Sequence, residues 1–216
     1  MPSFHIHAAS TPTGVYALIL AAGSAVRFGG GKLLAPLHGR PLISHVATTV
    51  AQALTAGTLS GAVAIVREHD TSLAWPLETA GATVIANPDA DQGMATSLKR
   101  GLAALGEMSL DPPAGAALVM LADQPNVSND VIARLVDSWR MNGRSVRPRY
   151  AATPATPGHP VLLDRALWSF ANGLTGDRGL GSLLAGRADL TVIDVPGRNP
   201  DVNTIEDLTR LNTPGH

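Results

Sequence analysis

The sequence predicts an α/β fold in which a mostly parallel sheet carries helices on both faces. Short apolar runs alternate with amphipathic segments along the 216 residues, as is typical of strand–helix–strand units. The first of these runs is apolar throughout and not only at every second position, which indicates a strand buried on both faces. There is no internal repeat. We therefore expect a single domain over residues 14–216 with right-handed crossovers, preceded by a flexible arm at residues 1–13.

The first half of the chain contains three expected strands and two expected helices. Pro41 begins a segment in which apolar residues recur every four positions, and Gly57 ends it. In chain order the elements are a strand at 15–20, a helix between Pro41 and Gly57, a strand at 61–67, a helix ending near Gly81, and a strand at 82–88 that closes on Asn87-Pro88.

The second half continues the alternation. Ser128 is a favourable N-cap for a helix whose apolar residues share one face. Residues 144–157 are rich in Arg and Pro and are not assigned to any element. The expected elements are a helix from Met94 to Leu105, a strand at 115–121, a helix after Ser128, a strand at 190–195 and a closing helix from Thr204 to Leu211.

Composition excludes several classes of function. The formal net charge is −1, so the chain lacks the basic surface of a general nucleic-acid binder. The absence of cysteine excludes disulfides, thiolate nucleophiles and cysteine-ligated metal centres. The longest apolar stretch, residues 15–22, is too short to cross a bilayer, and the first residues do not resemble a secretory leader. We expect a soluble cytoplasmic protein without nucleic-acid or membrane partners.

Three polar clusters directly follow predicted strands. They occupy residues 21–32, 87–97 and 122–126. In parallel sheets, ligands bind beyond the carboxyl ends of the strands, which meet at one edge. The three clusters together therefore predict a ligand site at that edge.

The first cluster is a glycine-rich loop with two positive charges. Backbone amides of such a loop can turn inward to bind an anion, and Arg27 and Lys32 would add charge against a polyphosphate. The alternative is a flexible connection whose charges are solvated. Two nucleotide-binding patterns are absent, because Val26 and Leu33 break a Walker loop and Ala25 breaks the dinucleotide fingerprint.

A third nucleotide-binding pattern does match. Residues 20–32, LAAGSAVRFGGGK, resemble the L-A-(A/G)-G-x-S-x-R-x-G-x-x-K signature of the MobA-like nucleotidyltransferase family, which includes the molybdenum-cofactor guanylyl- and cytidylyltransferases. Ala25 departs from it, where the signature has serine. Five further segments resemble family motifs in the same order, so the likeness spans residues 15–211. They are NPDADQGMATSLKRGL (87–102), MLADQPNVS (120–128), PGHPVLL (157–163), TGDRGLGSLL (175–184) and DVNTIEDL (201–208).

The resemblance implies a fold and a branch of the family. The implied fold is a three-layer sandwich of the nucleotide-diphospho-sugar transferase type, with a Rossmann-like sheet. LAAG, GMATS and ADQP are similar to the cytidylyltransferase (MocA-like) branch, whereas guanylyltransferases show LAGG, GPLAG and DMP or DTP at these places. The second alanine, Ala22, would add a methyl group against the base and favour a pyrimidine, a difference worth about 1–3 kcal/mol.

The resemblance also implies a reaction. A terminal phosphate of a molybdopterin-type acceptor would attack the α-phosphorus of CTP and release pyrophosphate. Lys32 would face the α- and β-phosphates and Arg27 the outer phosphates, while Asp123 would hold Mg²⁺ or Mn²⁺. The second metal ligand is Asn203 or Asp201, and the sequence leaves this choice open.

Further residues are assigned to the two substrates by the same resemblance. Gly158, His159 and Pro160 would bind the acceptor, although His159 is equally compatible with a structural turn. Asp177 and Arg178 would close a loop over the acceptor or cap a helix, and we favour the cap. The residues assigned to the nucleotide are Leu20, Ala21, Ala22, Gly23, Lys32, Gly93, Ser97 and Asp123.

Three alternatives remain open. The acceptor is a different phosphorylated alcohol or sugar that receives a cytidylyl or uridylyl group; or the protein is an NAD(P)H-dependent reductase of the same family; or it is a non-catalytic chaperone that passes cofactor to a recipient molybdoenzyme. The missing dinucleotide fingerprint argues against the reductase. Ala25 and the missing second aspartate leave room for the chaperone.

Overall fold

The computed structural model describes residues 13–213, and all but the last residue of the expected arm at 1–13 lie outside this range. Nine strands are present within it. A short hairpin, β2 (Pro36–Leu37) and β3 (Arg40–Pro41), stands apart from the main sheet. The strands of the main sheet are β1 (Gly14–Leu20), β4 (Gly61–Arg67), β5 (Ala82–Asn87), β6 (Ala114–Leu121), β7 (Val146–Tyr150), β8 (Val161–Asp164) and β9 (Thr191–Val195).

Helices connect these strands as the sequence predicts. The α-helices are α1 (Leu42–Thr55), α2 (Ala74–Thr79), α3 (Met94–Glu107), α4 (Asn129–Asn142), α5 (Leu180–Leu184) and α6 (Ile205–Asn212). Short 3-10 helices are η1 (Val26–Phe28), η2 (Lys32–Leu34), η3 (Thr71–Leu73), η4 (Ala90–Gln92) and η5 (Arg165–Gly173). Ser128 caps α4 as expected, because its hydroxyl accepts a hydrogen bond from the Val131 N–H.

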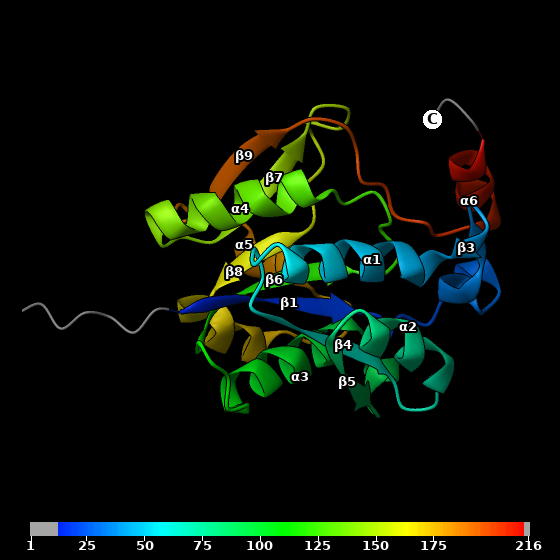
Figure 1. Cartoon of the computed structure of the whole chain (residues 1–216), viewed down its shortest axis with the longest axis horizontal. Coiled ribbons are helices and arrows are strands. Elements are labelled where there is room, and N and C mark those ends of the chain that lie inside the picture. Colours follow the sequence, from blue (N-terminus) through cyan, green and yellow to red (C-terminus); the bar gives the residue numbers. More distant parts are fainter. Residues whose placement is uncertain (1–12, 214–216) are drawn as a thin grey trace, which may run out of the picture.

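The main sheet has the order β5-β4-β1-β6-β8-β7-β9 and is mostly parallel (Figure 1). β8 is the exception, since it pairs antiparallel with both β6 and β7. The fold is therefore the α/β type with a mixed, mostly parallel sheet, as the resemblance in sequence implies.

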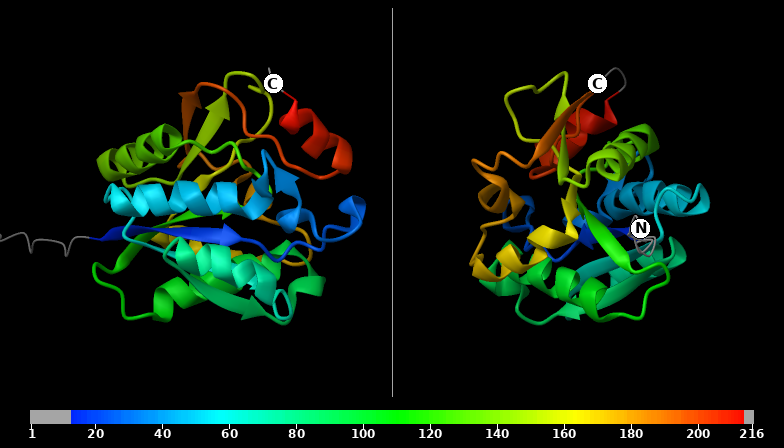
Figure 2. Two further views of the ribbon diagram at one scale, coloured as in Figure 1. Left: turned by 45° about the vertical axis from the view of Figure 1, so that its right-hand side comes forward. Right: turned by 90° about the vertical axis from the view of Figure 1, so that its left-hand side faces the viewer.

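Helices cover both faces of the main sheet (Figure 2), and a hydrophobic core lies on each face. Alternate residues of β1 show the division, because Ala17 and Ile19 belong to the core beneath α1, α2 and α4, whereas Tyr16 and Leu18 belong to the core beneath α3, η5 and α5. β1 is buried on both faces, which explains its continuous apolar sequence.

Two strands of the main sheet, like the two strands of the short hairpin, were not predicted from the sequence. β7 lies in the Arg- and Pro-rich segment that was left unassigned, and β8 has only four residues. Pro148 pairs with Ile193 of β9, but the pairing of β7 with β8 is limited to Val146. Proline is tolerated in β7 because no strand pairs with it on the β8 side, where an N–H group would otherwise be needed. Within residues 13–213, no helix has both the length and the apolar character needed to span a bilayer.

Candidate active site

A cavity of about 520 Å³ opens at the carboxyl ends of β1 and β6. All three polar clusters of the sequence contribute to it, which places them at one edge of the sheet as expected. The lining residues are Leu20, Ala21, Ala22, Gly23, Ser24, Ala25, Val26, Arg27, Lys32, Leu33, Ala90, Asp91, Gly93, Met94, Ser97, Leu121, Ala122, Asp123, Asp177 and Asn203.

The glycine-rich loop wraps one side of this cavity through two short 3-10 turns. Gly29, Gly30 and Gly31 have φ values of 85°, 97° and 61°, a region that favours glycine and explains the run. Ala25 also has a positive φ of 49°. The N–H groups of Phe28, Gly29 and Gly30 donate to carbonyls within the loop, so contacts to a bound anion fall to its other amides and to its two cationic side chains.

Lys32 and Asp123 form an ion pair at the floor of the cavity. Lys32 Nζ lies 2.6 Å from Asp123 Oδ2, and both side chains are largely buried. Burial raises the pKa of the Asp123 carboxyl, and the charge of Asp201 adds to this, whereas Lys32 lowers the pKa. Lys32 therefore helps to keep Asp123 ionised in a place that disfavours charge.

The segment 201–203 lies against Asp123 and supplies further oxygen atoms. The Val202 N–H donates to the Asp123 carbonyl at 3.0 Å, which fixes the segment beside the end of β6. Asn203 lines the cavity, and its Oδ1 accepts from Arg27 Nη2 at 3.3 Å. Asp201 is not a lining residue, and one of its oxygens accepts from Gln124.

These oxygens suit a hard divalent cation. Within residues 13–213, no cluster of three or more His, Cys, Asp or Glu side chains forms a complete metal cage. Mg²⁺ is ordinarily held by one or two carboxylates together with substrate phosphates, and Asp123, with Asp201 or Asn203, provides such a partial set. The donor set fits a metal that arrives with a polyphosphate.

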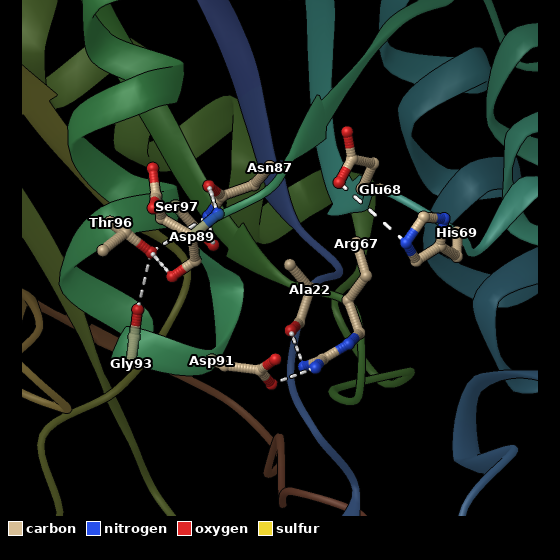
Figure 3. Close-up of polar contacts among 10 residues, drawn as sticks. All are labelled: Ala22, Arg67, Glu68, His69, Asn87, Asp89, Asp91, Gly93, Thr96 and Ser97. Carbon is tan, nitrogen blue, oxygen red and sulfur yellow. Dashed lines mark hydrogen bonds and ion pairs between the residues drawn. The ribbon is translucent and has the colours of Figure 1, made fainter.

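A hydrogen-bonded cluster lies at the start of α3 (Figure 3), where Gly93 and Ser97 line the cavity. Asn87, buried at the end of β5, donates from Nδ2 to Ser97 Oγ and to Thr96 Oγ1, at 2.9 Å each. Thr96 in turn donates to the Gly93 carbonyl at 2.9 Å. Asn87 thus fixes Ser97, which lines the cavity and was expected to face the base or ribose.

Arg67 bridges two walls of this end (Figure 3). Its Nη2 pairs with Asp91, a lining residue from η4, and its Nη1 donates to the Ala22 carbonyl at 3.4 Å. Since Ala22 follows β1 and Arg67 ends β4, one side chain links the first loop to the loop before α3.

Gly93 permits a close approach that shapes the cavity. Its φ is 103°, and a side chain there would overlap the backbone of Gly176. The Ala95 N–H donates to the Gly176 carbonyl at 3.0 Å, which holds the loop carrying Asp177 against α3. Our expectation that Asp177 caps a helix is wrong, because the N-cap of α5 is Gly179 and no side chain caps this helix, whereas Asp177 lines the cavity.

The residues assigned to the acceptor lie outside the cavity lining. The carbonyl of His159 accepts hydrogen bonds from Tyr150 Oη at 2.8 Å and from Asn199 at 3.2 Å. The residue is partly buried, and its Nδ1 atom is buried without a hydrogen-bond partner within the described chain. Burial, followed by the charge of Arg147, lowers the pKa of His159 to about 4, so the ring is neutral at physiological pH.

Comparison with known proteins identifies the family of this chain. The sequence pattern of the MobA-like NTP transferase domain matches residues 17–192. The chain belongs to this family. It is a nucleotidyltransferase, and the family reaction transfers a nucleotidyl group from a nucleoside triphosphate to a phosphorylated acceptor. A comparison with curated proteins gave no significant match.

Solved structures share the fold of this chain. The chain is similar to Rv0371c from Mycobacterium tuberculosis H37Rv, with a TM-score of 0.77, 27% identity and coverage of 93% of this chain and 98% of that one. Rv0371c in complex with manganese gives 0.73 and 26%, covering 92% and 98%. The 4-diphosphocytidyl-2C-methyl-D-erythritol synthase of Anaerococcus prevotii DSM 20548 shares the fold, with 0.71 and 17%, covering 93% and 95%.

Sequence reasoning about this MobA-like domain missed several polar residues of the site. Arg67, Asn87 and Asp91 were not assigned roles, although each lies at or just after the carboxyl end of a predicted strand. Their position at the ends of predicted strands was the signal that could have identified them as site residues. Gln124 and Asn199 were also missed, and no local pattern connects these two residues across 75 positions.

Proposed function

We propose that the protein transfers CMP from CTP to the terminal phosphate of a molybdopterin-type acceptor and releases pyrophosphate. The observation that carries the proposal is the arrangement of Lys32, Arg27 and Asp123 around one cavity of about 520 Å³. That volume is within the range of small-molecule sites. Two cations and a metal-binding carboxylate at the edge of a mostly parallel sheet suit a nucleoside triphosphate.

The base end of the cavity supports a pyrimidine. Ala22 is buried and lines the cavity, so its methyl group takes space that a glycine would leave open. The hydroxyl of Ser97 lines the cavity and accepts a hydrogen bond from Asn87, which supports its proposed contact with a base or ribose. These contacts favour CTP over the purine nucleotides by a modest free energy, because one methyl group is worth about 1–3 kcal/mol.

The protein supplies alignment and charge, and no nucleophile of its own. Both substrates are anions, so the cost of bringing them together is offset by Lys32 at the α- and β-phosphates and by Arg27 at the outer phosphates. Asp123, with Asp201 or Asn203, would hold Mg²⁺ or Mn²⁺, which would neutralise charge that develops on the phosphates. Rv0371c, solved with manganese, supports a divalent metal here.

The loop 157–160 is proposed to bind the acceptor through its backbone and outer surface. The partly buried, neutral imidazole of His159 does not line the cavity, so its proposed contribution is to hold the loop. A recipient molybdoenzyme would then take the product from this side of the protein.

Pyrophosphate release tests the proposal. Purified protein is incubated with Mg²⁺, CTP and molybdopterin-type cofactor, and we expect pyrophosphate together with a CMP-modified acceptor. Parallel reactions replace CTP with GTP, ATP or UTP, and the acceptor with phosphorylated alcohols or sugars. Release with a sugar phosphate alone would contradict the proposed acceptor. Metal-independent oxidation of NADPH would contradict nucleotidyl transfer as the activity.

Asp123→Ala is the matched inactive variant. Its turnover should fall at least 100-fold, because removing one electrostatic contact to the transition state costs this much in other enzymes. Asp130→Ala, at an acidic residue in the first turn of α4, is the control and should keep full turnover.

A further inference from the structure

Three loops that are far apart in the sequence meet at the Asp123 side of the cavity. They are residues 122–126 after β6, 157–160 before β8 and 199–203 after β9. The pairing of Val119 with Val161 places the start of β8 beside the end of β6. The Val202 N–H bond to the Asp123 carbonyl joins two of these loops through the backbone. The side-chain contacts between the loops run through Gln124 and Asn199.

Gln124 makes a hydrogen bond at each end of its side-chain amide. It is 6% exposed, so each polar atom of its amide needs a partner. Nε2 donates to Asp201 Oδ1, and Oε1 accepts from Asn199 Nδ2 at 2.9 Å. The residue therefore fixes one oxygen of Asp201 and leaves the other oxygen of that carboxylate available.

Asn199 extends the same network to the loop at 157–160. Its Nδ2 also donates to the His159 carbonyl at 3.2 Å, and its Oδ1 accepts from the Asn126 N–H at 3.2 Å. Tyr150 donates to the same His159 carbonyl. A continuous chain of hydrogen bonds thus leads from Asp201 to His159.

We propose that Gln124 and Asn199 are positioning residues that hold Asp201 beside Asp123 and fix the loop 157–160 relative to both. The inference rests on the proposed function, in which a metal–nucleotide binds at Asp123 and the acceptor at this loop. Neither residue touches a reacting atom. They act by setting the distance between the metal–nucleotide at Asp123 and the acceptor at the loop 157–160.

The residue type at position 124 follows from this role. Only a side chain that both donates and accepts can bond the Asp201 carboxylate and the Asn199 amide at once, and asparagine would be too short to reach both. Glutamate would face Asp201 with a like charge, and methionine would fill the space without either bond.

Binding of Mn²⁺ in the presence of CTP tests the Asp201 half of the bridge. Free Mn²⁺ is measured by electron paramagnetic resonance, without acceptor. In Gln124→Met we expect about tenfold weaker Mn²⁺ binding, since a hydrogen bond to a charged group is lost. CTP binding without metal should stay unchanged. Wild-type Mn²⁺ affinity in Gln124→Met would overturn the proposal.

Hydrogen exchange tests the acceptor-loop half. In both Gln124→Met and Asn199→Ala, peptides covering residues 157–164 should exchange faster, and unchanged exchange would overturn this half of the bridge. If Gln124→Met does not fold, Gln124→Asn replaces it and should show the same changes in smaller measure.

Gln52→Met is the matched control. Gln52 also bonds an asparagine, with Asn129 Nδ2 donating to its Oε1 at 2.7 Å, but it lies on the exposed surface of α1. It should alter neither Mn²⁺ binding nor exchange of the loop. If the wild-type protein failed to bind Mn²⁺ with CTP, the proposed function would fall, while the exchange experiment would still decide whether the bridge holds the loop.

Discussion

Lys32 Nζ lies 2.6 Å from Asp123 Oδ2, although 91 positions separate the two residues in the chain. The same two groups are proposed to bind the phosphates and the metal. Without ligands, the positive charge of Lys32 and the negative charge of Asp123 therefore neutralise each other. A bound metal would pair with Asp123 and leave Lys32 free for the triphosphate, and a bound triphosphate would likewise leave Asp123 free for the metal. Metal and triphosphate should consequently bind together.

The variant Lys32→Met separates these two roles. Transfer should fall at least 100-fold, because a cation at the phosphates is lost. At pH 8 and without nucleotide, Mn²⁺ should bind several-fold to about tenfold more tightly, since Asp123 no longer has a positive neighbour. Titration with Mn²⁺ measures this gain. Lys99→Met is the control, because Lys99, the other lysine, bonds only the Leu174 carbonyl in the described structure, and it should change neither quantity.

Lys32→Met should also change how Mn²⁺ binding depends on pH. Burial already raises the pKa of Asp123, and Lys32 opposes this rise, so removing Lys32 raises the pKa further. Protonated Asp123 cannot bind metal. Mn²⁺ affinity of the variant should therefore begin to fall at a higher pH than in the wild type as the solution is acidified. Identical pH profiles would show that the ion pair does not control ionisation of Asp123.

Gly93→Ala tests the packing between α3 and the loop that carries Asp177. A side chain at position 93 would overlap the backbone of Gly176 and would hold an unfavourable positive φ. We expect a loss of about 3 kcal/mol in the free energy of unfolding, measured in urea. Gly143→Ala, also at a positive φ but in open space, gives the strain alone and should cost about 1–2 kcal/mol. Equal losses would argue against the close approach.

Ala22→Gly tests how the base is selected. Removing the methyl group should raise kcat/KM for GTP relative to CTP by about tenfold, because it widens the base end of the cavity. Ala17→Gly is the control, since Ala17 belongs to the core on the α1 side of the sheet and does not line the cavity. It should lower stability without changing selectivity. A shift of equal size in both variants would remove Ala22 as the selective contact.

The buried strands were predictable because a short, continuously apolar sequence indicates a strand that is covered on both faces. A run such as residues 15–20 must be covered on both faces, and this fixes a central strand with helices on either side. The position of the site followed from topology, because parallel strands gather their carboxyl ends. β7 was not predictable in this way, since its alternating burial includes Pro148 and two arginines, which local patterns place in a loop.

Which side chains pair within the site depends on the tertiary structure, and local sequence patterns do not reveal it. Lys32 and Asp123 each lie within a recognisable motif, yet neither motif shows that the two residues form an ion pair. Gln124 stands next to Asp123, but its partners Asp201 and Asn199 lie more than 70 positions away. The likeness to family motifs suggested an acceptor role for His159, whereas its burial depends on how Tyr150, Arg147 and Asn199 pack around it.

His159 should make the fold sensitive to mild acid. Its pKa is lowered by burial to about 4, against an ordinary value of 6.5 in the unfolded chain. Between these values the unfolded chain takes up a proton that the folded protein excludes, so the free energy of unfolding falls as the pH drops from 6.5 towards 4. The full stability from this residue is present above pH 6.5, and the loss across the window is about 3 kcal/mol at most.

Urea unfolding at several pH values, compared with His159→Gln, isolates this contribution. Glutamine keeps a polar side chain but does not titrate, so the difference in stability between the two proteins should change steadily between pH 6.5 and 4. The charge of Arg147 also opposes protonation, while Asp201 favours it, so Arg147→Met should reduce the acid sensitivity. A constant difference between wild type and His159→Gln would mean that the imidazole is open to protons in the folded protein. That result would place the ring at the surface of the loop, where it could contact the acceptor directly.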